Sequence, residues 1–153
     1  MKFDQLKLSN QLCFPVYAAS RLITREYQPY LDKLGITYPQ YLVLMVLWET
    51  DRITVNDIST KLILNTNTLT PLLKRMESMD IITRKRSDED ERKVVISLTG
   101  KGKEMRSRAA SIPDELVNSL QKGTLSLTQL LELRTNLNVL IDFLKLKDEN
   151  TES

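Results

Sequence analysis

Histidine is absent from the 153-residue chain, and cysteine occurs once, at position 13. The usual nitrogen and sulfur ligands of metal sites are therefore missing, so we expect no bound metal and no cofactor. A catalytic Ser-His or Cys-His pair cannot be assembled either. A single cysteine cannot form a disulfide within the chain, which favours a reducing compartment. We expect a protein that is not an enzyme.

Long apolar runs, a signal peptide and a strong net charge are also missing. The longest uninterrupted apolar run, YLVLMVLW at residues 41–48, is less than half a membrane span. The N-terminal sequence MKFDQLKLSN lacks the apolar core of a signal peptide, so we expect a cytoplasmic protein without a membrane partner. The chain has 22 Lys and Arg and 20 Asp and Glu, so its formal net charge is only +2. Any surface for nucleic acid must therefore come from the local arrangement of charge.

Glycine and proline are scarce, with four and five residues respectively, and this favours long helices in one folding unit. Apolar residues recur at helical spacing over residues 8–34, but Pro15 and Pro29 interrupt the pattern and predict a bend or a late start. Thr37 and Gln40 have the spacing of a capping box and predict the start of a second, largely buried helix. The composition and these patterns indicate a mainly α-helical protein.

Two short helices and a hairpin are predicted in the middle of the chain. The apolar spacing predicts one helix in VNDISTKLIL and an amphipathic one in NTNTLTPLLKRMESMD. The segments 81–86 and 93–98 have strand composition and flank the polar turn SDEDER, so they predict a β-hairpin. Two helices followed by a hairpin are typical of a winged helix-turn-helix, here flanked by long helices suited to dimerisation.

In this arrangement the second helix enters the major groove by its N-terminal end, and the hairpin forms the wing. Short hydroxyl and amide side chains let the helix backbone approach DNA, and basic residues one turn later can reach phosphates or guanine edges. The candidates on the helix are Asn65, Thr66, Asn67, Thr68, Thr70, Pro71, Lys74 and Arg75. The candidates on the wing are Arg84, Lys85, Arg86, Asp90 and Arg92. Asp90 is placed to point the Arg92 guanidinium outward, toward a minor groove. An ordinary capped surface helix is the alternative.

The remaining helices are predicted to pair two copies of the chain. Thr99 predicts the start of a charged helix, and Ser126 with Gln129 predicts the start of the last helix. That last helix carries leucines at alternating spacings of three and four, which predicts packing against a partner helix, with packing inside one chain as the alternative. The stripe consists of Leu130, Leu133, Leu137, Leu140 and Leu144. We divide the chain into a helical dimerisation region at 1–35 and 99–147, a DNA-binding winged helix-turn-helix at 36–98, and a frayed polar tail at 148–153.

Two groups of motifs resemble a known family. The run RKRSDEDERKVVISLTGKG, preceded by LTPLLKRME, resembles the signature of the multiple-antibiotic-resistance regulator (MarR) family of dimeric winged-helix transcription factors. Its most specific part is Asp90-x-Arg92 followed by Leu98-Thr99. The front of the chain, with NQLCFPVY, Tyr27 and LGITYPQYLVLMVLWE, resembles the organic hydroperoxide resistance regulators within that family. The resemblance covers roughly residues 8–100.

The resemblance implies a homodimeric repressor that binds a pseudo-palindromic DNA operator and leaves it when Cys13 is oxidised by an organic hydroperoxide or a related oxidant. It also implies that Tyr17 and Tyr27, together with Tyr38 from the partner subunit, hold the reactive thiol. Phenol donors stabilise a thiolate and orient its sulfur. With no second cysteine to resolve a sulfenic acid, the next product is a mixed disulfide with a low-molecular-weight thiol, or an overoxidised sulfur.

Other interpretations of the residues remain open. Taken alone, an unpaired cysteine is more often a buried apolar filler, and the effector is then a small aromatic ligand lodged between the wing domain and the dimerisation helices. A thiol peroxidase and a pure interaction module are more remote alternatives. The chain departs from the family pattern at Pro15 and at Asn65-Thr66-Asn67-Thr68, where relatives generally have an Asp-Ser-Gly-Thr type sequence.

Overall fold

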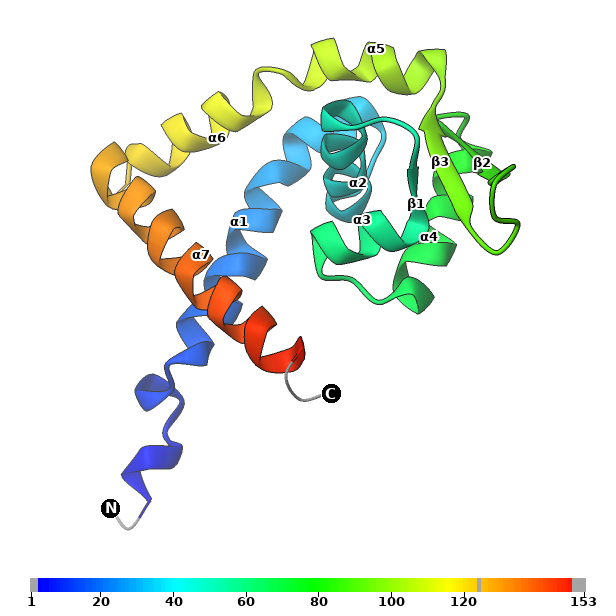
Figure 1. Ribbon diagram of the computed structural model, residues 1–153. Helices are drawn as coiled ribbons and strands as arrows, with labels where there is room; N and C mark the ends of the chain where they lie inside the picture. The colour runs from blue at the N-terminus through cyan, green and yellow to red at the C-terminus, as the bar shows by residue number, and fades with distance from the viewer. Residues whose placement is uncertain (1–2, 124, 150–153) are drawn as a thin grey trace. The chain divides into compact units, whose positions relative to one another are not determined.

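The computed structural model describes residues 3–123 and 125–149. The chain folds into helices with one small sheet (Figure 1), and no described helix has the length and apolar character to span a membrane. The elements are the 3-10 turns η1 (Asp4–Leu6) and η2 (Leu8–Asn10), α1 (Cys13–Leu34), α2 (Tyr38–Glu49), β1 (Ile53–Thr54), α3 (Val55–Leu62), α4 (Thr66–Ser78), β2 (Ile82–Arg86), β3 (Val94–Leu98), α5 (Gly100–Ala109), α6 (Ile112–Gln121) and α7 (Leu127–Glu149). They form two compact units, one up to Ile112 and one from Pro113 onward.

Helix α1 shows how the two prolines fit a long helix. It begins at Cys13, so Pro15 lies in the first turn, where a backbone donor has no partner within the helix. The predicted late start is confirmed. Pro29 does not end the helix, which continues to Leu34 and stops at Gly35, a left-handed residue with a φ of 69°. A glycine is favoured there because a Cβ is strained in that conformation.

Helix α2 is the centre of the first unit. The predicted capping box is present, with the Thr37 N–H donating to the Gln40 side-chain oxygen at 2.9 Å. Helices α1, α3, α4 and α5 all contact α2, which explains why it is apolar on nearly every side. The fully buried core residues come from all parts of this unit and include Leu31, Tyr41, Val43, Leu44, Leu47, Ile58, Leu69, Leu73, Met76 and Ile96.

The predicted winged helix-turn-helix is confirmed. Thr54 caps α3 in a reciprocal box with Asp57, and the side chain of Asn65 caps α4 by accepting from the Asn67 N–H at 2.9 Å. Strands β2 and β3 pair antiparallel, with Arg84 opposite Ile96. The short strand β1 adds to the far side of β3, giving an antiparallel sheet in the order β1-β3-β2.

The second unit consists of the remainder of α6 and all of α7. The predicted capping box at the start of α7 is present, since the Ser126 N–H donates to the Gln129 side chain at 2.9 Å. Helix α7 includes residues 148–149 of the expected polar tail, and residues 150–153 lie outside the described part of the chain. In the leucine stripe, Leu130 and Leu137 are half-buried, whereas Leu133, Leu140 and Leu144 are exposed.

Candidate functional site

The N-terminal half of α4 presents polar side chains to solvent while its opposite face is buried. Leu69, Leu73 and Met76 are fully buried against the core. This anchoring leaves the predicted DNA-contacting side chains outward: Asn65, Thr66, Asn67, Thr68, Pro71, Lys74 and Arg75 are exposed, and Thr70 is half-buried. The start of the helix is fixed by the Asn65 cap, and the polar side chains of its first turns are exposed.

Pro71 is accommodated inside α4 without ending the helix. A proline there has no N–H for the carbonyl one turn earlier. The Thr70 hydroxyl donates to the Thr66 carbonyl at 2.8 Å in the same region, so this turn keeps a side-chain hydrogen bond where the proline weakens the backbone ladder. The turn that precedes α4 is tight, with Ile63 in the left-handed region at a φ of 54°.

The tip of the wing carries an arginine held by a neighbouring carboxylate. Asp90 accepts from the Arg92 Nε at 3.0 Å and from its backbone N–H at 3.1 Å. These hydrogen bonds hold the pKa of the Asp90 carboxyl below its usual range. The Arg92 side chain is 91% exposed, so the predicted geometry, a guanidinium held at its base and turned to solvent, is confirmed.

The three basic residues of β2 differ in their surroundings. Lys85 and Arg86 are exposed, but the Arg84 side chain is only 21% exposed and lies 3.5 Å from the Glu77 carboxylate of α4. Glu77 also accepts from the Arg84 backbone N–H at 3.1 Å. Within the described residues, the Arg84 Nε is buried and has no hydrogen-bond partner. Arg84 therefore ties the wing to α4, a long-range contact that the sequence pattern does not reveal.

A groove of about 300 Å³ connects these elements. Its walls come from the start of α3, the first turns of α4 and the wing, and it is lined by Thr54, Val55, Asn56, Thr66, Thr70, Arg84, Arg92, Lys93 and Val94. Two helix N-termini and three basic side chains thus meet at one surface. Backbone N–H groups at helix N-termini together with Arg and Lys side chains favour phosphate groups. Asn56 and Lys93 are additional candidates that the sequence interpretation did not include.

Cys13 is the first residue of α1 and is exposed. Tyr17 lies one turn later, also exposed, with the Arg21 guanidinium 5.7 Å from its ring centre. Residues four apart share a helix face, so Cys13 and Tyr17 are neighbours on one side of α1. No hydrogen bond joins Cys13 to a tyrosine within the part of this single chain that the structure describes.

Tyr27 and Tyr38 meet at the other end of α1, with ring centres 4.9 Å apart. Both also contact Tyr41, a buried residue that sequence reasoning did not include, although it follows Tyr38 by three positions on α2. Burial, with Tyr38 and Tyr41 nearby, raises the pKa of Tyr27 to about 12. Burial raises the pKa of Tyr38 as well, so both phenols stay protonated at neutral pH and are able to donate a hydrogen bond.

The distance along α1 separates these two groups of residues. Cys13 and Tyr27 are 14 positions apart on one continuous helix, which at 1.5 Å per residue places them about 21 Å apart. Tyr27 and Cys13 of the same chain therefore do not meet. Tyr27 belongs with Tyr38, and if either tyrosine contacts a Cys13 thiol, that thiol comes from another copy of the chain.

Comparison with known proteins identifies close similarity along nearly the whole chain. A family model described as transcriptional regulator SarA/Rot matches residues 25–108. An organic hydroperoxide resistance transcriptional regulator of Bacillus subtilis (strain 168) is 49% identical over 148 residues, which cover 96% of this chain and 98% of that protein.

Solved structures of AbfR, a protein of Staphylococcus epidermidis, are similar in fold and sequence. The structure of reduced AbfR bound to DNA has a TM-score of 0.76 at 37% identity, covering 95% of this chain and 97% of that one. The structure of disulfide-formed AbfR has a TM-score of 0.61 at 37% identity, with 97% of each chain covered. The similarity extends over the helix-turn-helix, the wing and the flanking helices.

Proposed function

This chain belongs to the MarR family of winged helix-turn-helix transcriptional regulators, in the group of organic hydroperoxide resistance regulators, and on that premise we propose that oxidation of Cys13 releases it from its operator. Like its relatives, it is a DNA-binding transcriptional regulator and not an enzyme. We further propose that it binds its operator as a homodimer and that an organic hydroperoxide or a related oxidant reacts with it in the cytoplasm.

The groove between α3, α4 and the wing supports the operator contacts. We place the first turns of α4 in the major groove, because their side chains are short, polar and exposed. Lys74 and Arg75 then reach the flanking phosphates, while Lys85, Arg86 and Arg92 of the wing follow the adjacent backbone and minor groove. Arg84 and Asp90 hold the wing and its arginine in place rather than reading bases.

A homodimer provides the second half of the operator site. The proposed dimerisation region is 1–35 and 99–147, and several of its apolar side chains are exposed in the single chain, among them Leu12, Val16, Leu22, Leu133, Leu140, Phe143 and Leu144. Their burial between two copies favours association. Two-fold symmetry places the two recognition helices about one turn of DNA apart, roughly 34–36 Å, and requires a pseudo-palindromic operator.

The arrangement of α1 is the observation that carries the sensing proposal. Cys13 and Tyr17 lie at one end, and the paired donors Tyr27 and Tyr38 lie at the other. A symmetric dimer in which two α1 helices cross brings the Cys13 of each subunit to Tyr27 and Tyr38 of the partner subunit. The resulting site spans the dimer interface, so a change at the sulfur acts on the relative placement of the two subunits.

The chemistry follows from a thiolate and a hydroperoxide. The Cys13 sulfur attacks the terminal peroxide oxygen, the O–O bond breaks, and the alkoxide takes a proton to leave as an alcohol. The sulfenic acid formed then condenses with a low-molecular-weight thiol, giving a mixed disulfide and water. The adduct removes the negative charge and adds bulk among the phenols, which disrupts the interface and changes the spacing of the two recognition helices.

Fluorescence anisotropy on labelled DNA from upstream of the chain's own gene tests this proposal. Reduced protein is titrated onto the DNA, and a stoichiometric organic hydroperoxide is then added with and without a small thiol. We expect wild type to dissociate and Cys13→Ser to bind equally well but stay bound, because serine keeps the size of the residue and lacks the reactive sulfur. Release of Cys13→Ser by the same oxidant eliminates the mechanism.

Tight binding of wild type that the oxidant does not change leaves a DNA-binding regulator with a different effector. The search then turns to small aromatic molecules.

A further inference from the structure

A chain of ring contacts leads away from the tyrosine pair into the core. Tyr41 lies 5.8 Å from Tyr27 and 6.4 Å from Tyr38, measured between ring centres. The Trp48 ring follows at 6.1 Å from Tyr41, in an edge-to-face arrangement with an interplanar angle of 69°. Aromatic rings in edge-to-face contact have a favoured geometry. A movement of Tyr27 or Tyr38 therefore affects the packing of Tyr41 against Trp48.

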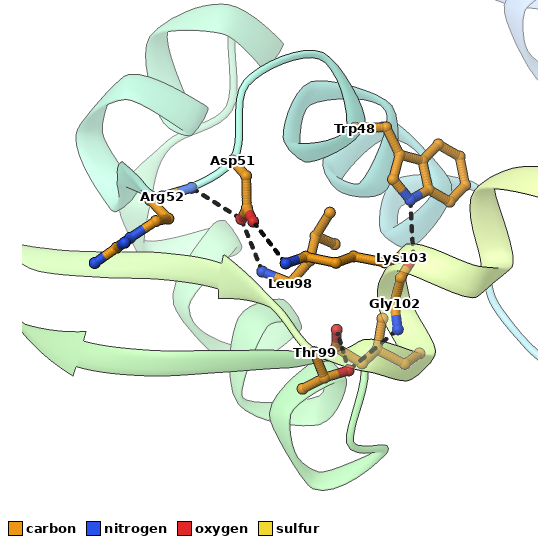
Figure 2. Close-up of polar contacts among 8 residues, drawn as sticks. Trp48, Asp51, Arg52, Leu98, Thr99, Gly102 and Lys103 are labelled. Carbon is orange, nitrogen blue, oxygen red and sulfur yellow. Dashed lines mark hydrogen bonds and ion pairs between the residues drawn. The ribbon is translucent and has the colours of Figure 1, made fainter.

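The far side of Trp48 is fixed to helix α5. Its indole N–H donates to the carbonyl of Gly102 at 2.9 Å, as Figure 2 shows. Gly102 lies in the first turn of α5, where a Cβ would clash with the Ile81 carbonyl oxygen. A glycine is therefore required for α5 to approach the backbone where the wing begins. Trp48 thus contacts the point at which α5 and the wing meet.

Thr99 connects the same turn to the end of the recognition helix. Its hydroxyl accepts from the Gly102 N–H at 3.1 Å and lies 2.7 Å from the Asp80 carbonyl and 2.9 Å from the Ile81 carbonyl. Asp80 and Ile81 link α4 to β2. Thr99 therefore joins the first turn of α5 to the segment that connects the recognition helix to the wing.

Asp51, which follows α2, fixes the other side of this junction (Figure 2). Its Oδ1 accepts from the Leu98 N–H at 2.9 Å and from the Arg52 N–H at 2.9 Å, and its second oxygen lies 3.8 Å from the Lys103 ammonium. Leu98 ends β3, so α2 holds the wing through Asp51 and holds α5 through Trp48. We call the residues Trp48, Asp51, Leu98, Thr99 and Gly102 the wing junction.

We propose that Trp48 is a positioning residue that couples the packing of Tyr27 and Tyr38 to the orientation of the wing. This inference rests on the proposed function, since it concerns how oxidation of Cys13 reaches the DNA-binding surface. A close-packed aromatic cluster shifts between discrete arrangements and does not deform gradually. Rearrangement of the tyrosine pair moves Trp48 through Tyr41, and the hydrogen bond to Gly102 carries the movement from Trp48 to the other residues of the wing junction.

The first test compares operator affinity before and after oxidation in Trp48→Phe. Phenylalanine keeps an aromatic ring against Tyr41 but has no N–H for Gly102. We expect reduced Trp48→Phe to bind the operator, while the ratio of oxidised to reduced dissociation constants falls about three- to tenfold below that of wild type. Tyr30→Phe serves as the matched control, because it also removes one polar group from a half-buried aromatic ring. We expect this control to leave the ratio of oxidised to reduced dissociation constants unchanged. Equal ratios in wild type and Trp48→Phe overturn the inference.

Intrinsic fluorescence provides a second readout, because Trp48 is the single tryptophan of the chain. We expect the emission of the wild-type protein to change on oxidation in the absence of DNA, and the emission of Cys13→Ser to stay constant. Release from DNA without any change in emission contradicts the inference while leaving the proposed function intact.

A double-mutant cycle on the reduced protein tests the coupling without an oxidant. Tyr38→Leu, Trp48→Phe and the double variant are compared for operator affinity, with thermal unfolding to confirm that each is folded. We expect Tyr38→Leu to weaken binding about three- to tenfold in the wild-type background and by less than about twofold beside Trp48→Phe. Additive effects overturn the inference even where oxidation of wild type fails to release DNA, so failure of the proposed function and failure of this inference are distinguishable.

Discussion

Arg84 and Arg92 lie on one hairpin but face different environments, and their surroundings determine what each can do. Arg84 is mostly covered and paired with Glu77 of α4, whereas Arg92 is held by Asp90 and exposed. A covered arginine contributes to the packing of the wing, and an exposed one is available to a phosphate or a minor groove. The sequence shows both residues as basic, and the register of the hairpin decides between the two roles.

Arg92→Ala should weaken operator binding about tenfold and lower the slope of affinity against salt concentration by about one, since one phosphate contact is lost. Titrations by anisotropy at several salt concentrations measure both quantities. Lys122→Ala removes an equal charge from an exposed position just after α6 and is the matched control. An equal loss of affinity in both variants would mean that net charge alone accounts for the effect.

The same variant also reports on Asp90. In wild type the hydrogen bonds from Arg92 lower the pKa of Asp90, so the contact between carboxylate and guanidinium persists above that lowered value and is lost as pH falls through it. In Arg92→Ala the pKa of Asp90 should rise toward its ordinary range. Carbon-13 NMR of the carboxyl group follows the titration, and a midpoint that does not move would contradict the assigned contact.

Helix starts are the elements that sequence reasoning predicted best, because each depends on a few neighbouring residues. The capping residues Thr37, Thr99 and Ser126 all precede helices as expected. Contacts between distant segments could not be predicted in this way. The pairing of Arg84 with Glu77 and the approach of Gly102 to Ile81 depend on how elements pack, and a local sequence pattern carries no information on that packing.

In the candidate site, too, local features could be predicted from the sequence and contacts between distant residues could not. The exposure of the first turns of α4 and the Asp90 contact with Arg92 follow from local patterns, and the structure shows both. The resemblance grouped Tyr27 with Tyr17 around Cys13, but the unbroken helix from Cys13 to Leu34 separates them. Pro15 made the start of that helix uncertain in the sequence, so the length of helix between the two residues could be measured only in the structure.

At the first turn of α5, two glycines should respond in opposite ways to alanine. Gly102→Ala forces a Cβ against the Ile81 carbonyl, and we expect the free energy of unfolding to fall by about 1–3 kcal/mol. A Cβ at Gly100 would meet open space, and its φ is not positive, so Gly100→Ala should raise that free energy by about 0.4–1 kcal/mol. Urea unfolding measures both, and a Gly102→Ala protein as stable as wild type would show that the approach is not tight.

At the scale of the whole molecule, one copy of the chain leaves apolar surface uncovered. Helix α7 exposes Leu131, Val139, Ile141, Phe143 and Leu146 in addition to three leucines of the predicted stripe. The apolar surface of α7 is thus wider than the stripe. An exposed surface of this kind is typical of a helix that packs against more than one neighbour, in agreement with the proposed dimer.

The 14 positions that separate Cys13 from Tyr27 also fix where the two-fold axis of the proposed dimer lies. Suppose that each Cys13 lies beside Tyr27 of the partner subunit. In two straight α1 helices related by a two-fold axis, the points midway between residues 13 and 27 then lie at least as close together as Cys13 and the partner's Tyr27 do. That midpoint is Ser20, in the small-residue run Ala18-Ala19-Ser20, so the two-fold axis of the dimer passes beside Ser20 and its symmetry mate. Small side chains at a crossing point allow two helix backbones to approach closely.

Chemical cross-linking can locate that axis. In a Cys13→Ser background, Ser20→Cys should give a covalent dimer with a short bis-maleimide, because residue 20 meets itself across the axis. Gln28→Cys, exposed on the same helix, should stay monomeric on a denaturing gel, since eight residues on each side of the axis separate its two copies by about 24 Å. Efficient cross-linking at 28 and none at 20 would place the axis elsewhere. The spacing of a cysteine and a tyrosine along one helix thus specifies where two subunits cross.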